Sequence, residues 1–281
     1  MVNFNGSFFD PVSPIINANS RVLEFGDALF EELRVINGAF MFWEAHYFRL
    51  MSSMRILRME IPMEFTMEFL EDAIRNTITK SGLENKPVAV TIIVVRRNGM
   101  DNTVNDTSVD YLIKVKPLDN PFFILDEKGL KVELFKDFYL NSDMLSNLNS
   151  NNKSINVVAQ IYAQENGYDS CLLINTNKHV VQAIAGNLFM ITANHIKTPP
   201  LTDGCIDGIV RKQLIELAMN LTDYQLEETS ISPFELQKAD ELFIANDLTG
   251  INSIGNYRKK VYTNEVAKLL VGQLNAKARL A

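Results

Sequence analysis

The stretch from Asn147 to Asn187 reads NLNSNNKSINVVAQIYAQENGYDSCLLINTNKHVVQAIAGN, and it decides the fold. An Asn-rich loop comes first, followed by a segment whose apolar residues Ile155, Ala159 and Tyr162 recur at helical spacing. Gly167 ends this segment where a helix C-terminus usually carries glycine. A short apolar strand, a turn and a second strand come next. The pattern therefore predicts a loop, a helix and a β-hairpin in succession.

Composition is that of an ordinary globular protein. With 281 residues, of which 47% are hydrophobic and 22% charged, the chain can bury the core of one large domain or of two domains of ordinary size. The net charge of -7 argues against a nucleic-acid partner, because binding phosphates needs a basic face. No apolar run approaches bilayer length, and residues 1–5 lack the pattern of a signal peptide. We therefore expect a soluble cytoplasmic protein without a membrane partner.

The cysteine content supports the same compartment. Cys171 lies on an apolar strand and Cys205 in a glycine-flanked loop, and no CxxC pair occurs in the sequence. This arrangement favours two unpaired thiols in a reducing cytoplasm. No metal site is predicted.

Local signals also indicate how the chain is divided. The Asn-Gly pair at residues 37–38 lies between two apolar runs and predicts a β-hairpin. Apolar spacing predicts a helix over residues 63–81 and strands over 88–95 and 111–115. Residues 117–121, PLDNP, hold two prolines and are typical of a linker. We expect a smaller N-terminal α/β domain over residues 1–116 and a larger C-terminal α/β domain over residues 122–281.

Several short motifs recur in a fixed order along the chain. They are FGDALFEELR at 25–34, HYFRL at 46–50, QENG at 164–167, DSCLL at 169–173, TPPL at 198–201 and GCIDGIVR at 204–211. Together they resemble the class IV, fold-type IV enzymes that depend on pyridoxal 5′-phosphate (PLP): branched-chain and D-amino-acid aminotransferases and aminodeoxychorismate lyase. The resemblance spans nearly the whole chain. It implies an α+β fold of two domains with a cofactor cleft between them, in a homodimer whose partner helps close the cleft.

The resemblance also implies where the Schiff-base lysine should lie. Counting back from Gly167 without gaps places that lysine at Asn149, and Lys153 follows about one helical turn later. Moving Lys153 into the lysine's place would delete four helix residues and spoil the match at Asn152 and Asn156. We prefer the ungapped alignment, in which the family lysine is absent.

Further positions concern the cofactor phosphate. By resemblance, Arg49 would contact the phosphate, and a guanidinium suits that role because it offers a planar, permanently charged fork. Ile209 and Val210 would offer backbone N–H groups at a helix start, although Val210 replaces the family's threonine. Asn246 and Asp247 stand where relatives place phosphate-binding hydroxyls. A carboxylate facing the phosphate would repel it.

The ring and substrate positions differ as well. The family glutamate that pairs with the pyridine nitrogen falls on Gln182, whose neutral amide cannot balance a pyridinium charge. Phe30 takes a position that faces the substrate side chain in relatives. A second arginine that traps the substrate carboxylate in some relatives is Asp101 here, so that trap is either lost or rebuilt from Arg97.

Two hypotheses follow. In the first, the chain is an aminotransferase-like protein whose PLP chemistry is impaired or lost, acting through its dimer or binding an anionic metabolite. In the second, it is an active PLP-dependent aminotransferase or lyase in which Lys153 binds the cofactor from a shifted position, with an amino acid or keto acid as substrate. The motifs that specify the fold are kept and those that specify the cofactor are replaced, which favours the first hypothesis.

Overall fold

The computed structural model describes residues 1–16, 20–97 and 107–280, which form two compact units. The first unit contains residues 1–121 together with the short segment 149–152, and the second contains 122–148 and 153–280. The segment 149–152 therefore leaves the second unit and returns to the first.

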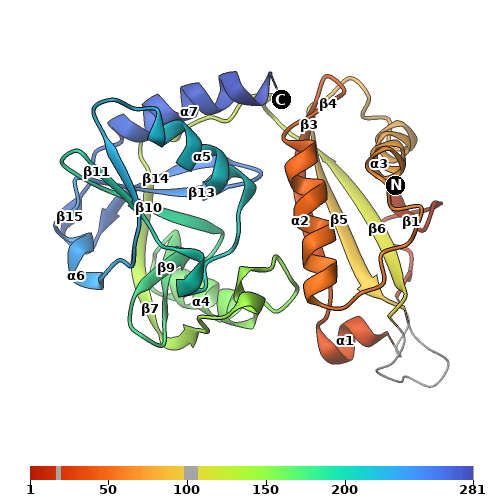
Figure 1. Cartoon of the computed structure of the whole chain (residues 1–281), viewed down its shortest axis with the longest axis horizontal. Helices are drawn as coiled ribbons and strands as arrows, with labels where there is room; N and C mark the ends of the chain where they lie inside the picture. Colours follow the sequence, from red (N-terminus) through yellow and green to blue (C-terminus); the bar gives the residue numbers. More distant parts are fainter. Residues whose placement is uncertain (17–19, 98–106, 281) are drawn as a thin grey trace. The chain divides into compact units, whose positions relative to one another are not determined.

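The first unit is built on an antiparallel sheet in the order β2-β1-β6-β5-β3-β4. Its strands are β1 (Val2–Phe4), β2 (Ser7–Phe9), β3 (Leu29–Ile36), β4 (Ala39–Phe40), β5 (Val88–Arg96) and β6 (Val109–Pro117), and its helices are α1 (Arg21–Phe25), α2 (Trp43–Ile56) and α3 (Met67–Lys80). Helix α2 packs beside β3, and α3 packs beside β1 and β6 (Figure 1). Every second residue of β5 from Val88 to Val94 is buried, as expected for a strand with one face in the core.

Two sequence-based expectations for this unit can be compared directly with the structure. The hairpin between β3 and β4 turns at Asn37 and Gly38, and both residues have positive φ, as a tight hairpin turn requires. The helix expected from residue 63 begins only at Met67. It begins there because the hydroxyl of Thr66 accepts a hydrogen bond from the Phe69 N–H at 3.2 Å and so caps the helix.

The Asn-rich segment 149–152 lies along the start of β3. The backbone carbonyl of Asn149 accepts a hydrogen bond from the Phe30 N–H at 2.7 Å. Asn151 is bound twice to Ala28, since its N–H donates to the Ala28 carbonyl at 3.1 Å and its side-chain Oδ1 accepts from the Ala28 N–H at 3.0 Å. The segment is therefore held as a short extra pairing at this strand.

The second unit contains a mixed sheet in the order β12-β11-β10-β13-β14-β7-β8-β9, with β15 on β14. Its strands are β7 (Leu130–Leu140), β8 (Ser170–Asn175), β9 (Val180–Ala183), β10 (Gly186–Thr192), β11 (His195–Thr198), β12 (Gln225–Glu228), β13 (Glu241–Asn246), β14 (Gly250–Tyr257) and β15 (Lys260–Val261). Strand β9 pairs with β8 and also with β10. As a result, β10, β13, β14, β7, β8 and β9 close into a ring around apolar residues that include Leu172, Leu188 and Leu242.

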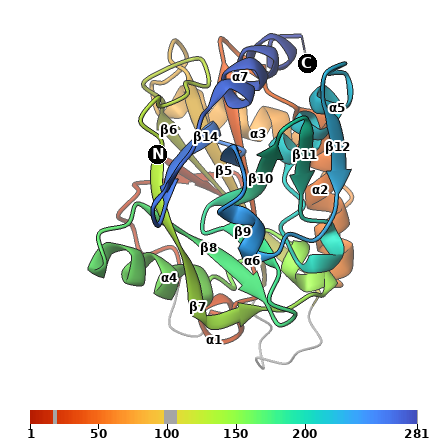
Figure 2. The same cartoon turned by 90° about the vertical axis from the view of Figure 1, so that its left-hand side faces the viewer.

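Helices of the second unit cover this ring. Among the described residues they are α4 (Ser154–Glu165), α5 (Ile209–Met219), α6 (Pro233–Leu236) and α7 (Glu265–Ala278), with 3-10 turns η1 at Met144–Asn147 and η2 at Leu201–Asp203. Helix α4 packs on β7 and β8 through Ala159 and Ala163, while α5 and α7 lie side by side and away from α4 (Figures 1 and 2). Gly167 follows α4 with φ of 67°, in agreement with the predicted helix end. The described part of the chain contains no helix with the length and hydropathy that a bilayer-spanning segment requires.

Candidate functional site

The start of helix α5 is the best-defined polar site of the second unit. A helix N-terminus exposes backbone N–H groups and the positive end of the helix dipole, so it attracts an anion. Here the anion is part of the protein, because Asp247 Oδ1 accepts a hydrogen bond from the Val210 N–H at 2.9 Å. Asp247 directly follows β13, and Ile209 is the first residue of α5. Asp247 is therefore a helix cap supplied by a neighbouring strand.

The opposite end of β13 repeats this arrangement. The Glu241 carboxylate accepts hydrogen bonds from the N–H groups of Val266 at 2.9 Å and Ala267 at 2.6 Å, at the start of α7. Burial raises the pKa of Glu241 above its ordinary value, although the two backbone hydrogen bonds act in the opposite direction. One strand thus supplies a carboxylate cap to each of two helices.

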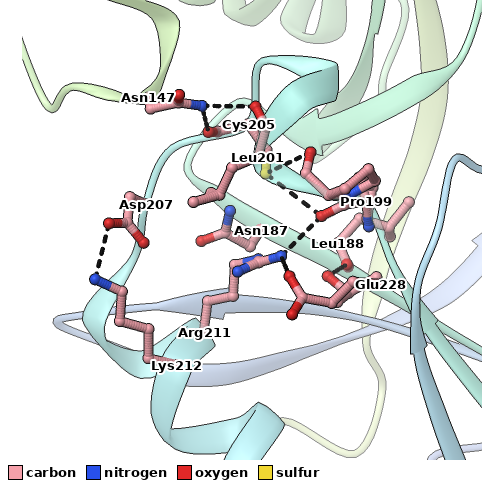
Figure 3. A network of polar contacts seen from close by, with 12 residues as sticks. Asn147, Asn187, Leu188, Pro199, Leu201, Cys205, Asp207, Arg211, Lys212 and Glu228 are labelled. Atoms are coloured by element: carbon pink, nitrogen blue, oxygen red, sulfur yellow. Dashed lines mark hydrogen bonds and ion pairs between the residues drawn. The ribbon is translucent and has the colours of Figure 1, made fainter. Parts of the chain in front are cut away.

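The loop before α5 is held by amide side chains. Asn187 donates to the Ile206 carbonyl at 2.7 Å. Asn147 donates to the carbonyls of Leu201 at 2.9 Å and Cys205 at 2.7 Å (Figure 3). A Cβ at Gly208, the N-cap of α5, would lie 2.4 Å from Asn187 Oδ1, so a larger residue there would displace the Asn187 side chain. The backbone at the helix start is therefore fixed in place.

Behind this loop, Arg211 is buried and points toward β12 and the TPPL segment (Figure 3). Its Nη2 donates to the Pro199 carbonyl at 2.9 Å and to Glu228 Oε2 at 2.6 Å. Next to Arg211, the half-exposed Lys212 forms an ion pair with Asp207, with Lys212 Nζ 2.8 Å from Asp207 Oδ2. These contacts hold the first turn of α5 against the sheet. The Arg211 guanidinium is bound by groups of the protein, the Pro199 carbonyl and Glu228.

Gln182, which the resemblance aligns with the family's pyridine-binding glutamate, is hydrogen-bonded to the same loop. It is buried on β9, and its side-chain Oε1 accepts a hydrogen bond from the Ile206 N–H at 2.9 Å. The Ile206 carbonyl in turn accepts from the Gly208 N–H at 2.9 Å. The second unit therefore brings Gln182, the start of α5 and Asp247 into one hydrogen-bonded arrangement.

The two candidates for the lysine position have different surroundings. Asn149 lies in the segment that pairs with β3 of the first unit. Lys153 belongs to the second unit, where it is the half-buried N-cap residue of α4 and its carbonyl accepts the first helical hydrogen bond, from the Val157 N–H at 2.9 Å. The chain thus passes from one unit to the other between these residues.

Arg49 is held by a buried carboxylate of the first unit. Its Nε donates to Glu31 Oε1 at 2.8 Å and its Nη2 to Glu31 Oε2 at 2.7 Å, and His46 Nδ1 lies 2.9 Å from the same Oε2. Burial alone would raise the pKa of Glu31, but the charge of Arg49 and the hydrogen bonds from His46 and Arg49 lower it below its usual value. Glu31 was not singled out as a site residue from the sequence, although it stands in the FGDALFEELR motif.

The other sequence-predicted residues have local contacts of their own. Phe30 is half-buried on β3, and Arg97 is exposed, with its Nε 2.9 Å from Asp110 Oδ1. Asn246 shapes the turn after β13: its Nδ2 donates to the Ala185 carbonyl at 2.5 Å and its Oδ1 accepts from the Leu248 N–H at 2.8 Å. The prediction for Asp101 lies outside the described residues.

The two thiols are buried. Cys171 and Cys205 are free and buried, and burial raises the pKa of each to about 11. Thiols with such a pKa are poor nucleophiles near neutral pH. Across residues 1–16, 20–97 and 107–280, no group of three or more His, Cys, Asp or Glu side chains is placed to hold a metal ion.

Comparison with known proteins identifies the family. The model of the family "Amino-transferase class IV" matches residues 28–257. D-alanine aminotransferase from Staphylococcus aureus is 26% identical over 251 residues, covering 86% of this chain and 83% of the relative. Two solved structures share the fold. The branched-chain aminotransferase from Thermoproteus uzoniensis has a TM-score of 0.86 and is 23% identical, covering 97% of this chain and 92% of the other. The branched-chain amino acid aminotransferase from Thermobaculum terrenum in its PLP form has a TM-score of 0.85 and is 20% identical, covering 99% and 93%.

These matches confirm the resemblance drawn from the motifs and the α+β, fold-type IV architecture. They cover the chain from β3 to β14, including the start of α5 and the capping residue Asp247. The chain belongs to the class IV aminotransferase family.

Proposed function

We propose that this protein keeps the class IV aminotransferase scaffold and has impaired or lost PLP chemistry. The observation that carries the proposal is the hydrogen bond between the Asp247 carboxylate and the Val210 N–H at the start of α5. By resemblance to the family, this helix start would be the place where the cofactor phosphate binds. In this chain a carboxylate already satisfies the backbone donor.

Electrostatics sets the size of the conflict. A phosphate that approached the Val210 N–H would meet the negative charge of Asp247 a few ångströms away. One such like-charge contact at about 4 Å and an effective dielectric constant of about 20 costs roughly 4 kcal/mol. Because Asp247 is half-buried, salt and water reduce this cost to about 1.4 to 3 kcal/mol, which corresponds to a tenfold to hundredfold loss of affinity. The residues at the start of α5 therefore do not fit the PLP phosphate.

The ring-binding position points the same way. Gln182 offers a neutral amide where the family has a carboxylate, and its Oε1 is engaged by the Ile206 N–H. A hydrogen bond to a charged partner is worth on the order of 1.5 to 3 kcal/mol, and the amide cannot supply that to a pyridinium. Asn149 has no amine at the preferred lysine position. Residues that would bind the phosphate, the pyridine ring and the cofactor aldehyde are therefore replaced. Together these replacements support impaired or lost PLP chemistry.

The proposed state of the protein is a cytoplasmic homodimer in which transamination is impaired or lost. Membership of a dimeric, PLP-dependent family supports the homodimer, and the two buried free thiols agree with a reducing compartment. The second hypothesis, an active aminotransferase or lyase, would require Lys153 to serve as the covalent lysine. Its half-buried place at the start of α4 keeps that hypothesis testable.

A trapping experiment separates the two. The full-length protein is incubated with PLP, scanned for near-visible absorption, reduced with borohydride and digested, and the peptides are mapped by mass. The variant Lys153→Arg and a PLP-dependent class IV aminotransferase treated in parallel serve as controls. We expect no absorption band in the protein and no label on Lys153 above that of other lysines. A stoichiometric label on Lys153 that Lys153→Arg abolishes would refute the proposal.

A further inference from the structure

The second unit contains a pocket that none of the family motifs explains. Its volume is about 550 Å³, within the range of pockets that hold small molecules. It lies between the end of β7, the β8–β9 turn, α6 and the β14–β15 turn; β7, β8, β9 and α6 are labelled in Figure 2. None of its lining residues belongs to the helix start at α5 or to the other sequence-predicted site positions.

The floor of the pocket is apolar and belongs to the core. Leu134, Ile174 and Tyr257 line it and are almost fully buried, and all three belong to the core cluster inside the strand ring. Phe234, on α6, also lines the pocket and is 80% exposed. A buried apolar floor beside an exposed aromatic ring offers contact area to a flat apolar molecule.

The rim of the pocket is cationic. Lys136, Lys178 and Arg258 line it, together with His179, and no Asp or Glu is among the lining residues. The Lys136 side chain is exposed and makes no hydrogen bond or ion pair with any other residue that the structure describes. Lys178 lies over the Tyr139 ring, with its Nζ 3.5 Å from the ring centroid. Lys178 and Arg258 occupy turns with φ of 64° and 53°, a conformation uncommon for residues other than glycine and asparagine.

The carboxylates near this rim lie behind the cations. Arg258 Nε is 3.5 Å from Glu133 Oε1, but the Arg258 side chain is 43% exposed and that of Glu133 only 14%. His179 Nδ1 is 3.7 Å from Asp203 Oδ1, and again the His179 side chain is the more exposed partner, at 38% against 10%. In both pairs the cationic or imidazole side chain is the one more exposed at the rim, in a protein whose net charge is -7.

We propose that this pocket is a second ligand site that binds a small organic anion with a flat apolar body, such as an aromatic carboxylate. The body would pack on Leu134, Tyr257 and Phe234, and the anionic group would lie among Lys136, Lys178 and Arg258. This site is independent of PLP and would persist in a protein without transaminase activity.

Matched probes test the two halves of the proposal. Binding to the full-length protein is measured by titration calorimetry for indole-3-acetate, for the neutral indole-3-acetamide and for acetate. The ligand efficiency of typical small ligands gives indole-3-acetate a dissociation constant on the order of 1 mM. We expect saturable binding of indole-3-acetate, and binding of the amide and of acetate that is weaker by about tenfold or more, since each lacks one of the two interactions.

Variants then locate the binding. Lys136→Gln and Phe234→Ala change exposed side chains, so both proteins should fold, and each is expected to weaken indole-3-acetate binding by about three- to tenfold. Lys86→Gln, an exposed lysine of the first unit, is the matched control and should leave binding unchanged. Equal binding of the acid and the amide, an absence of saturation, or a Lys136→Gln protein that binds as the unaltered chain does would overturn the proposal.

Discussion

Replacing Asp247 by serine should produce two opposite effects. The hydrogen bond from the Val210 N–H to Asp247 Oδ1, at 2.9 Å, would be lost, because the shorter serine side chain does not reach the helix start. Losing a helix cap costs typically about 1 kcal/mol of folding stability. The same change removes a negative charge from an anion-binding helix start. A phosphate should therefore bind more tightly to a less stable protein.

The gain in phosphate affinity can be bounded. Coulomb's law gives roughly 4 kcal/mol for two like charges at about 4 Å with an effective dielectric constant of about 20. Asp247 is only half-buried, so salt and water reduce this value, and we expect a gain of about 1.4 to 3 kcal/mol. That corresponds to a tenfold to hundredfold lower dissociation constant for inorganic phosphate or PLP in Asp247→Ser than in the unaltered protein.

The assay combines calorimetric titration with phosphate and urea unfolding. Glu241→Gln is the matched control, since Glu241 caps α7 from the other end of the same strand. It should lower the free energy of unfolding without any gain in phosphate affinity. The reasoning is refuted if Asp247→Ser loses stability and shows no tighter phosphate binding, or if the unaltered protein already binds phosphate as tightly as the variant.

Three further predictions concern stability and reactivity. Glu31→Gln should lower the free energy of unfolding by about 3 to 5 kcal/mol, because a neutral amide would replace the carboxylate that pairs with the buried charge of Arg49. Because the folded-state pKa of Glu31 is lowered, Glu31 stabilises the fold above its unfolded-state pKa, and this stabilisation is lost as the pH falls through the folded-state pKa. Urea midpoints measured between about pH 7 and 3 should therefore decline less steeply in the variant than in the unaltered protein. Cys171 and Cys205, each with a pKa raised to about 11, should react with Ellman's reagent at about pH 8 only after denaturant is added, and rapid reaction of the native protein would contradict their burial. Gly272→Ala should raise the free energy of unfolding by about 0.5 to 1 kcal/mol, because nothing lies within 4 Å of a Cβ at this helical position. A lower urea midpoint in this variant would show that α7 is packed against another group there.

Local signals in the sequence predicted local structure well. The Asn37-Gly38 turn and the glycine after α4 follow from backbone conformations that few other residues adopt, so short motifs suffice to place them. The strand ring of the second unit is different. It closes through β9, which pairs with β8 and with β10, and such pairing depends on contacts that no short pattern encodes.

In the candidate site too, the sequence indicated single positions but not the contacts between them. Counting along the family motifs drew attention to Val210, Gln182 and Asp247 as altered positions. It did not indicate that Asp247 would turn to the Val210 N–H, because the two residues are distant in sequence and only the fold brings them together. The partner of Arg49 was also missed: Glu31 is an ordinary motif residue until β3 and α2 pack side by side.

A crystal structure grown with saturating PLP tests the central claim most directly. We predict that the Asp247 carboxylate will remain on the Val210 N–H and that no density will join the Lys153 amine to the cofactor. A structure with the cofactor phosphate on the Val210 N–H, Asp247 turned away and a covalent bond to Lys153 would contradict the account.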